Sequence, residues 1–450
     1  MMPPVLPRVV GEGFEQLADD QELWRAIEGE HRRQSERLVL VASSSVTHPS
    51  VLAAQASTAQ NVTAEGYPGR RYHAGCEGVD RIEALAVERA CAVFGARYAN
   101  VQPHSATTAN QTVLSSLLRP GDTVLGMDLA SGGHLTHGSK AAFSGQYFHA
   151  VGYGLDTAGL IDYDEVARLA RECRPKLIIC GATAYSRAID FARFRSIADE
   201  VGAYLLADIS HTAGLVAAGL HPSPIDHAHI TTTCTHKQLF GPRGGLILMG
   251  ADADTPGPDG RRTLREHFQR AVFPFFQGAP VMNTIAAKAR ALDRAASPEF
   301  AQVMRRVVDN AGALADSFAM LGYPVVSGGT DNHIVLLDLS PLGLTGLAAE
   351  EALESAHMVV NKNRVPGDTR PALVTSGIRL GSNTVAYRGM GPLEMAECAT
   401  LFDDVVQELR RGDGARLPVA VRDRVRERVA ALCSAFPLPG YHAMEGALVS

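Results

Sequence analysis

Short apolar runs alternate with stretches of helical apolar spacing between about residues 80 and 285. The segment 82–93 repeats apolar side chains at helical intervals, which predicts an amphipathic helix. The runs at 123–127, 176–180 and 203–208 are short and apolar, as buried strands are. Strands and helices that alternate in this way form a mostly parallel sheet with helices on both faces. The sequence therefore predicts an α/β fold.

The pattern changes after the alternating region. A helical run from about 303 to 321 leads into a segment with fewer strand signals, and the polar stretch 251–260 is typical of a surface loop. We expect an N-terminal arm at 1–50, a large domain at 51–300 and a smaller C-terminal α+β domain at 301–450.

Composition excludes several classes of protein. The chain has 450 residues, 46% of them hydrophobic and 20% charged, enough for a large core. Its net charge of -6 offers no electrostatic surface for nucleic acid or an anionic membrane. The residues from Met1 to Pro7 lack the pattern of a signal peptide, and no apolar run reaches the length of a membrane span. We therefore expect a cytoplasmic protein. Seven scattered cysteines argue against a structural metal or a disulfide framework.

Lys237 is the strongest candidate for chemistry. It follows the β-branched run 231–235 and precedes the glycine-rich turn 241–245. A lysine held in a closed polar site can form an imine, and pyridoxal phosphate supplies both the carbonyl and a ring that accepts electrons. That ring needs a proton on its nitrogen, which Asp208 at the end of another strand could hold. His211 is placed to reach the phenolic oxygen. A random lysine usually lies on the surface, but these flanking segments favour a cofactor lysine.

Several motifs resemble those of the serine hydroxymethyltransferases, enzymes of the pyridoxal-phosphate fold type I, which is aspartate aminotransferase-like. The likeness covers the lysine segment and extends over roughly residues 20 to 435. Its other motifs are 64–72, 98–105, 132–138 and 375–379. The resemblance implies pyridoxal 5'-phosphate as cofactor and tetrahydrofolate as cosubstrate.

The resemblance also assigns roles to single residues. A phosphate binds well where hydroxyls and amides open a helix, as at Ser105, and we expect that helix at 111–118. The guanidinium of Arg379 would bind the substrate carboxylate in a bidentate manner. Glu65 would handle protons, and His134 would stack on the ring. By this resemblance the catalytic residues are Lys237, Glu65, Asp208 and His236; the cofactor site comprises Ser105, Ala106, Thr107, His134, Asp208, His211, His236, Lys237 and Gly278; the substrate site comprises Ser43, Thr63, His73 and Arg379; and the folate site comprises Glu65, Tyr72, Leu129, Gly133, Leu135 and Asn363.

The chain departs from the family pattern close to the reacting carbon. Thr63 and His73 stand where the family has tyrosines, and Cys234 stands where it has threonine. The Ser-Glu-Asn segment of the family reads Ser43–Ser45 here, and its Gln-Gly-Gly-Pro turn reads Gln277–Pro280. Losing two phenol rings frees volume in a packed site, where one methylene decides about 1 to 3 kcal/mol of discrimination. We expect Thr63, His73 and Cys234 to set substrate choice and to admit a bulkier amino acid.

Three functions remain open at this point. The first is a folate-dependent hydroxymethyltransferase that acts on serine or on 2-methylserine, with glycine or D-alanine as the partner amino acid. The second is a folate-independent threonine aldolase or transaldolase that passes a glycine carbanion to another aldehyde. The third is a non-catalytic homologue with a binding or regulatory role. Because the family takes Thr63, Glu65 and Gly278 from a neighbouring subunit, we expect a homodimer or a dimer of dimers with shared active sites.

Overall fold

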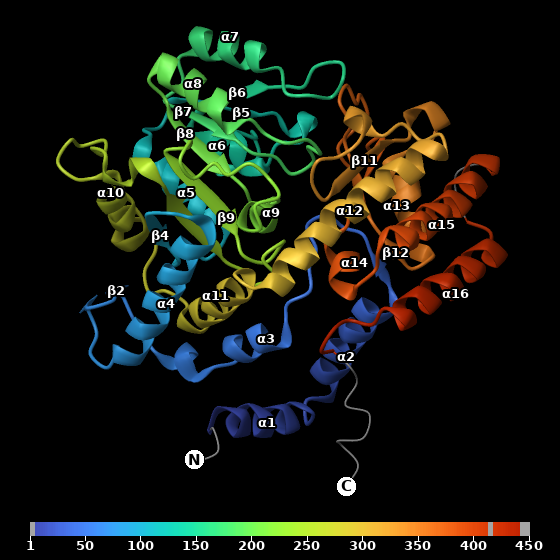
Figure 1. The fold of residues 1–450 in the computed structure, drawn as a ribbon, viewed down its shortest axis with the longest axis horizontal. Coiled ribbons are helices and arrows are strands. Elements are labelled where there is room, and N and C mark those ends of the chain that lie inside the picture. Colours follow the sequence, from blue (N-terminus) through green and yellow to red (C-terminus); the bar gives the residue numbers. More distant parts are fainter. Residues whose placement is uncertain (1–4, 413–416, 442–450) are drawn as a thin grey trace.

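A seven-stranded sheet forms the centre of the larger unit of the molecule (Figure 1). The computed structural model describes residues 5–412 and 417–441, so the ends of both predicted terminal segments lie outside the described residues. Only β10 runs antiparallel to its neighbours, so the predicted α/β fold with a mostly parallel sheet is confirmed. The strand order is β4 (Tyr98–Asn100), β10 (Gly245–Met249), β9 (Ile230–Cys234), β8 (Tyr204–Asp208), β7 (Leu177–Cys180), β5 (Thr123–Met127) and β6 (His149–Tyr153).

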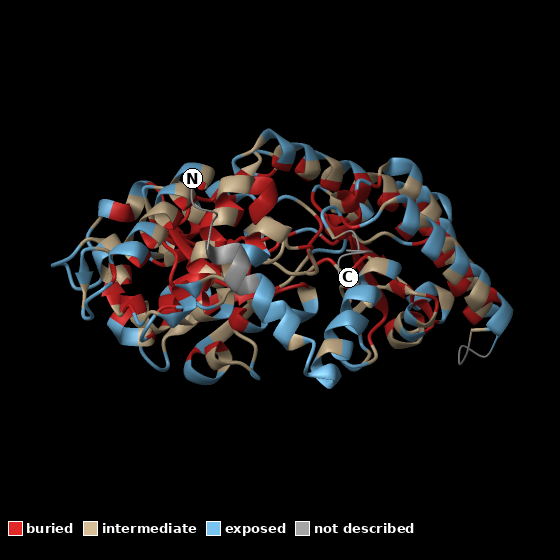
Figure 2. Ribbon diagram, turned by 90° about the horizontal axis from the view of Figure 1, so that it is seen from below, coloured by how far each residue is buried: buried red, intermediate tan, exposed pale blue. Residues whose placement is uncertain are grey.

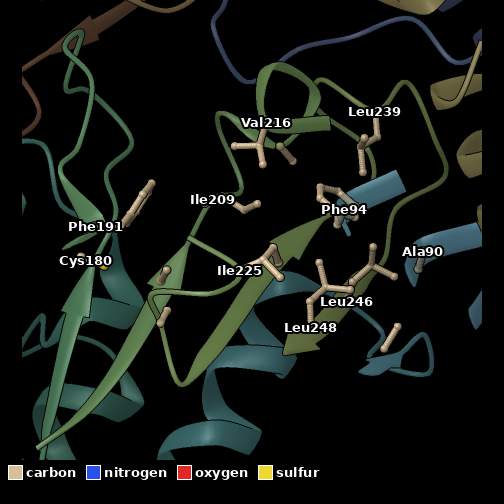
Figure 3. Packing of buried hydrophobic residues seen from close by; sticks show 14 of the residues in the cluster. Ala90, Phe94, Cys180, Phe191, Ile209, Val216, Ile225, Leu239, Leu246 and Leu248 are labelled. Atoms are coloured by element: carbon tan, nitrogen blue, oxygen red, sulfur yellow. The ribbon is translucent and has the colours of Figure 1, made fainter. Parts of the chain in front are cut away.

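Helices cover both faces of this sheet because alternate strand residues point to opposite sides. In β7, Leu177 and Ile179 belong to one hydrophobic cluster, whereas Ile178 and Cys180 belong to the other. Figure 3 shows part of the second cluster, where Leu246 and Leu248 of β10 lie near Phe94 of α4. The first face is covered by α5 (Ala106–Leu117) and α10 (Leu264–Arg270), and the second by α4 (Glu77–Phe94), α7 (Tyr163–Cys173), α8 (Phe191–Val201) and α11 (Met282–Ala295).

A smaller unit packs beside the first and has its own core. The antiparallel sheet β11–β14–β13 is covered by helices, and buried residues gather inside both units (Figure 2). The N-terminal segment joins this unit, since β1 (Leu38–Val39) pairs with β12 (Met358–Val359). The other elements here are α2 (Gln21–Glu36), β11 (Ile334–Asp338), α13 (Gly346–Ser355), β13 (Asn361–Asn363), β14 (Gly377–Gly381), α14 (Asn383–Arg388), α15 (Pro392–Arg411) and α16 (Val419–Ala435).

Helix α12 (Pro298–Met320) connects the two units (Figure 1). Its residues up to Val307 pack in the larger core, and those from Ala311 onward pack in the smaller one. The core therefore changes within one helix, and the division at 1–50, 51–300 and 301–450 stays a prediction. Further short elements are α1 (Val5–Leu17), α3 (Pro49–Gln55), β2 (Gly66–Tyr67), β3 (Arg70–Arg71), α6 (Phe143–Tyr147) and α9 (Ala213–Ala217).

Most elements expected from the sequence are present. The helix at 82–93 lies within α4, and the three predicted strands are β5, β7 and β8. The expected helix start at residue 111 is wrong, because α5 begins at Ala106 and ends at Leu117. Ser105 starts the helix early: its hydroxyl accepts a hydrogen bond from the Thr108 amide at 3.0 Å. Within the part of the chain that is described, no helix is long and apolar enough to cross a membrane.

Candidate cofactor and substrate site

The lysine turn follows a fully buried strand. Strand β9 ends at Cys234, and the Gly241 amide donates to the Thr235 carbonyl at 2.9 Å, which closes the turn around Lys237. Glycine is required at positions 244 and 245, where a side chain would clash with neighbouring segments. A Cβ on Gly244 would lie 2.2 Å from Cε of Lys288, and one on Gly245 would lie 2.3 Å from the Ser105 carbonyl oxygen. The glycine-rich turn thus lets the lysine segment pack against the start of α5.

Lys237 offers a reactive amine. Its side chain is half-buried, and burial lowers the pKa of its ammonium below the ordinary value. Among the described residues, Nζ has no hydrogen-bond partner, and it is not sealed from solvent. The neutral amine is therefore accessible, as imine formation needs.

Asp208 lies at the end of β8 and is held by several donors. Its Oδ2 accepts from Asn110 Nδ2 at 2.8 Å and from His137 Nε2 at 3.1 Å. Its Oδ1 accepts from the Ser210 amide at 3.0 Å and from the Ser210 hydroxyl at 2.6 Å. Burial would raise the pKa of this carboxyl, but the interactions with His137, His134 and Ser210 together outweigh burial and hold the pKa well below its ordinary value. Asp208 therefore stays ionised and can keep a proton on a ring nitrogen.

His134 lies above this carboxylate. Its Nδ1 accepts from the Thr136 amide at 3.2 Å, and burial lowers its pKa to about 4, so the ring is neutral. The rings of His134 and His137 lie 5.6 Å apart. His134, His137 and Asp208 bring atoms of the kind that bind metals within 4.8 Å of one another. Each of these residues is already engaged in protein hydrogen bonds.

The N-terminus of α5 has the features of an anion-binding site. Ser105 and Thr108 join through their hydroxyls at 2.9 Å, Ala106 is half-buried and Thr107 is exposed. Below this turn lies Lys288, which is 1% exposed. Its Nζ donates to the carbonyls of Val101, Pro103 and Gly245 at 2.6, 2.9 and 3.0 Å. A helix N-terminus that carries hydroxyl side chains and lies close to a buried lysine amine favours a phosphate.

Arg379 is a buried cation with no acidic partner. It is 9% exposed, and among the described residues no carboxylate forms an ion pair with it. Its Nη1 donates to the Thr183 carbonyl at 2.5 Å and its Nε to Asn361 Oδ1 at 3.1 Å, which leaves Nη2 without a partner and open to solvent. Burial lowers the pKa of Arg379 to about 10. An anionic ligand would complete this arrangement.

His211 faces the same space as these two cations. It is 3% exposed, yet its Nε2 has no partner among the described residues and keeps contact with solvent. Burial and the charges of Lys237 and Arg379 lower its pKa well below the ordinary value, so the ring is neutral. Lys237, Arg379 and His211 therefore present open polar atoms to one site.

His236 and Cys234 lie beside the lysine. The His236 backbone carbonyl accepts from the Ser45 hydroxyl, and burial lowers the pKa of its ring to about 4. Cys234 is buried and its Sγ donates to the Ser210 carbonyl at 3.4 Å. Ser43 is half-buried and lies on the segment that packs against β14, where a Cβ on Gly381 would come within 2.4 Å of Ala42 Cα.

The predicted folate residues on this side of the chain differ in exposure. Leu129 and Leu135 are each 48% exposed, so both side chains can contact a ligand. Gly133 is buried between them, where a Cβ would lie 1.9 Å from the Met127 carbonyl oxygen. Asn363 is half-buried on β13 and pairs in register with Gly377.

A second group of predicted residues lies elsewhere in the chain. His73 Nε2 is 3.4 Å from Glu65 Oε2, and a Cβ on Gly278 would lie 3.6 Å from Glu65 Oε1. Tyr72 is 74% exposed and Thr63 is exposed. Within the described residues, no hydrogen bond, ion pair or ring contact joins this group to Lys237, Asp208 or Arg379. These residues therefore gather around Glu65, and Gln277, next to Gly278, accepts from the His104 amide beside Ser105 at 3.1 Å.

The hairpin that carries Glu65 is rigidly held. Arg71 Nε donates to Asp80 at 2.7 Å and its Nη2 to Glu83 at 2.6 Å, while its Nη1 donates to the Ala64 and Gly66 carbonyls at 2.9 and 2.8 Å. Its side chain is 3% exposed. Glu65 thus projects from a fixed turn.

Sequence reasoning did not single out several residues of this site. His137 lies inside the motif 132–138, where a second histidine in the glycine-rich loop was an available signal, and Asn110 directly precedes the helix expected at 111–118. Thr183, Asn361 and Lys288 carried no local signal, because their partners lie far away in the sequence.

The charged and polar groups at this site match one kind of ligand. A molecule with a phosphate, a carbonyl and a protonated ring nitrogen would match the start of α5, Lys237 and Asp208 at once, and pyridoxal phosphate has all three. Site and sheet topology together define a pyridoxal-phosphate enzyme of fold type I.

Comparison with known proteins gives the family. The model of the serine hydroxymethyltransferase family matches residues 17–402, and the chain belongs to this family. The serine hydroxymethyltransferase of Rhodospirillum centenum is 54% identical over 426 residues, 94% of this chain and 96% of that protein. The serine hydroxymethyltransferase of Chromohalobacter salexigens is 51% identical over 419 residues, 93% of this chain and 97% of that protein. The family uses pyridoxal phosphate, with tetrahydrofolate as cosubstrate.

Proposed function

We infer that this chain is a pyridoxal-phosphate-dependent hydroxymethyltransferase that moves a one-carbon unit between serine and tetrahydrofolate. One observation carries this inference: the buried guanidinium of Arg379, without an acidic partner, shares a site with the accessible amine of Lys237. This pair suits an amino acid, whose carboxylate binds the guanidinium while its amine exchanges with the lysine. Both curated relatives named above are called serine hydroxymethyltransferases.

Each residue of the site has a separate role in the proposed transfer reaction. When bound, the cofactor withdraws electrons from the Cα–Cβ bond of the amino acid. Asp208 would hold the proton on the ring nitrogen, and Arg379 would bind and orient the substrate carboxylate. Lys237 would hold the cofactor through its amine until a substrate amine replaces it. Glu65 manages the proton on the hydroxymethyl oxygen or on a folate nitrogen.

We propose that the active site is shared between subunits of a homodimer or a dimer of dimers. Glu65, His73 and Gly278 lie together and, among the described residues, make no hydrogen bond or ion pair to Lys237, so a second copy can bring them to the first copy's cofactor. The exposure of Tyr72 supports this arrangement, because its ring packs on Phe273 but is 74% exposed and so is accessible to a second subunit. We also propose a cytoplasmic location, where one-carbon metabolism supplies both substrates.

A second candidate substrate is 2-methylserine, with D-alanine as the product amino acid. Thr63 and His73 replace two phenol rings of the family, and Cys234 is buried next to the lysine turn at 2% exposure. These changes leave room for an α-methyl group, whereas the folate residues are retained. The comparisons do not favour a folate-independent threonine aldolase or a non-catalytic homologue.

A substrate panel tests the proposal. Purified protein with cofactor is incubated with L-serine, 2-methylserine or L-threonine, each with and without tetrahydrofolate, and the amino acid products are quantified. We expect glycine from serine only when tetrahydrofolate is present, or D-alanine from 2-methylserine under the same condition. Arg379→Met serves as an inactive control. Glycine formed from serine at equal rates with and without tetrahydrofolate, and more slowly than glycine from threonine, would contradict the proposal.

A further inference from the structure

A second buried histidine lies directly behind His211. His333 precedes β11 and is fully buried, with 0% exposure. Its ring stacks on that of His211, with centroids 5.6 Å apart and planes inclined by 17°. The two come from opposite units of the molecule, since His211 follows β8 in the larger unit and β11 belongs to the smaller one. Neither the sequence pattern nor the proposed reaction assigns a role to His333.

The backbone fixes which nitrogen of His333 carries its proton. His333 Nε2 lies 3.1 Å from the carbonyl oxygen of Ala42. A carbonyl oxygen only accepts, so Nε2 must be the protonated nitrogen. The carbonyl is itself held, because Asn383 Nδ2 also donates to it at 3.1 Å, and because β14 packs tightly on Ala42 at Gly381. The acceptor therefore cannot turn away from His333.

The tautomer of His211 follows from that of His333. The same His333 Nε2 lies 3.4 Å from His211 Nδ1. Because Nε2 has its proton, two N–H groups would clash there if His211 Nδ1 also carried one. His211 Nδ1 is therefore the unprotonated nitrogen, and a neutral ring must then carry its proton on Nε2. Burial keeps both rings neutral by lowering their pKa values.

The protonated nitrogen of His211 is the one that faces the site. Nε2 has no partner among the described residues and stays in contact with solvent, although the residue is 3% exposed. A neutral N–H aimed into this space can donate to an oxygen of a bound molecule. The other tautomer would present a lone pair, which repels an anionic oxygen.

We propose that His333, through the Ala42 carbonyl, is a positioning residue that locks His211 in its Nε2–H tautomer, so that His211 donates to the phenolic oxygen of the bound cofactor. This assignment rests on the proposed function for the identity of the acceptor. The chain from Ala42 to His333 to His211 also links the Ser43 segment, which approaches the substrate, to the cofactor.

The test compares two replacements of His333. His333→Gln keeps an amide N–H that can reach both the Ala42 carbonyl and His211 Nδ1, whereas His333→Leu removes the donor. His229→Leu is the matched control: His229 also packs on a ring, that of Tyr204, but it lies at the opposite end of the sheet. Each protein is made with ¹⁵N-labelled histidine rings, and the His211 signals are identified from their loss in His211→Asn.

The direct readout is the ¹⁵N shift of the two His211 nitrogens, with and without cofactor. We expect Nε2–H alone in the wild type, in His333→Gln and in His229→Leu, and a mixture of tautomers in His333→Leu without cofactor. If the competent tautomer falls to between a half and a fifth, the dissociation constant of pyridoxal phosphate rises about two- to fivefold in that variant. His333→Gln should bind the cofactor as tightly as the wild type.

The outcomes separate this inference from the proposed function. A wild-type protein that binds pyridoxal phosphate but shows the His211 proton on Nδ1 overturns the role of His333 alone. The same holds if His333→Leu, still folded by circular dichroism, keeps pure Nε2–H and wild-type affinity. A wild-type protein that shows Nε2–H but binds no pyridoxal phosphate leaves the tautomer lock standing and removes the proposed function.

Discussion

Replacing Arg379 by methionine should abolish substrate binding without weakening the fold. Burial lowers the pKa of Arg379 from its ordinary value to about 10, which corresponds to about 3 kcal/mol for holding the charge in this site, at about 1.4 kcal/mol for each pH unit. The penalty is present at every pH below about 10. Methionine removes it and loses the hydrogen bonds to Thr183 and Asn361, worth about 1 kcal/mol each. The net expectation is a variant as stable as the wild type, or about 1 kcal/mol more stable.

Substrate binding should respond in the opposite direction. Removing one partner of a buried, hydrogen-bonded ion pair costs about 2 to 5 kcal/mol, so the dissociation constant of glycine should rise about thirtyfold or more. Calorimetric titration of the cofactor-loaded protein with glycine measures the affinity, and urea unfolding measures the stability.

Arg388→Met provides the matched control. Arg388 is also buried, at 5% exposure, but it donates to the carbonyls of Cys433, Phe436, Gln34 and Ser35 and so ties together the ends of α2 and α16. This variant should lose several kcal/mol of stability, because four carbonyls lose a charged donor. An Arg379→Met protein that unfolds as early as Arg388→Met, or that binds glycine normally, would refute the reasoning.

Three further predictions follow from the buried lysine and from the divided site. Burial lowers the pKa of Lys288 from 10.5 in the unfolded chain to about 7, so the folded protein loses stability as pH falls from 10.5 through 7. In urea unfolding, the wild type should therefore gain stability relative to Lys288→Met as pH rises from 7 to 10, by at most about 1.4 kcal/mol per pH unit. Parallel stability curves for the two proteins would exclude this. Mixing inactive Glu65→Gln and Lys237→Ala subunits should restore about a quarter of the activity, since half of the random dimers have one intact site; full activity of a monomer would rule out sharing. Changing Thr63 and His73 together to tyrosine should shift kcat/KM toward serine over 2-methylserine by about ten- to a hundredfold, measured against both single variants; unchanged ratios would place specificity elsewhere.

The sequence predicts the larger unit well because its signals are local. Strands such as 204–208 are short apolar runs, and their alternation with helices leaves one arrangement of the sheet. The start of α5 was misplaced because Ser105 caps the helix before any apolar periodicity begins. Lys237 and Asp208 could be found because each follows such a strand, and parallel strands end at the same edge of the sheet.

The rest of the site depends on contacts between distant segments. The hydrogen bond from His137 to Asp208 joins residues 71 positions apart in the sequence, and that from Arg379 to Thr183 joins residues 196 positions apart. No local sequence pattern can therefore predict either bond. Within one chain, Glu65 contacts His73 and makes no hydrogen bond to Lys237, which only the folded structure shows. The resemblance assigned Glu65 a role but did not predict which residues Glu65 contacts.

Lys237 should carry the cofactor at a site that binds an amino acid. The most direct test is to load the protein with pyridoxal phosphate, reduce it with borohydride, and locate the modified peptide by mass spectrometry. We expect one phosphopyridoxyl group per chain, on Lys237, displaced when excess glycine is added before reduction, and absent from Lys237→Ala. Stoichiometric modification of another lysine in active wild-type protein, unaffected by glycine, would contradict it.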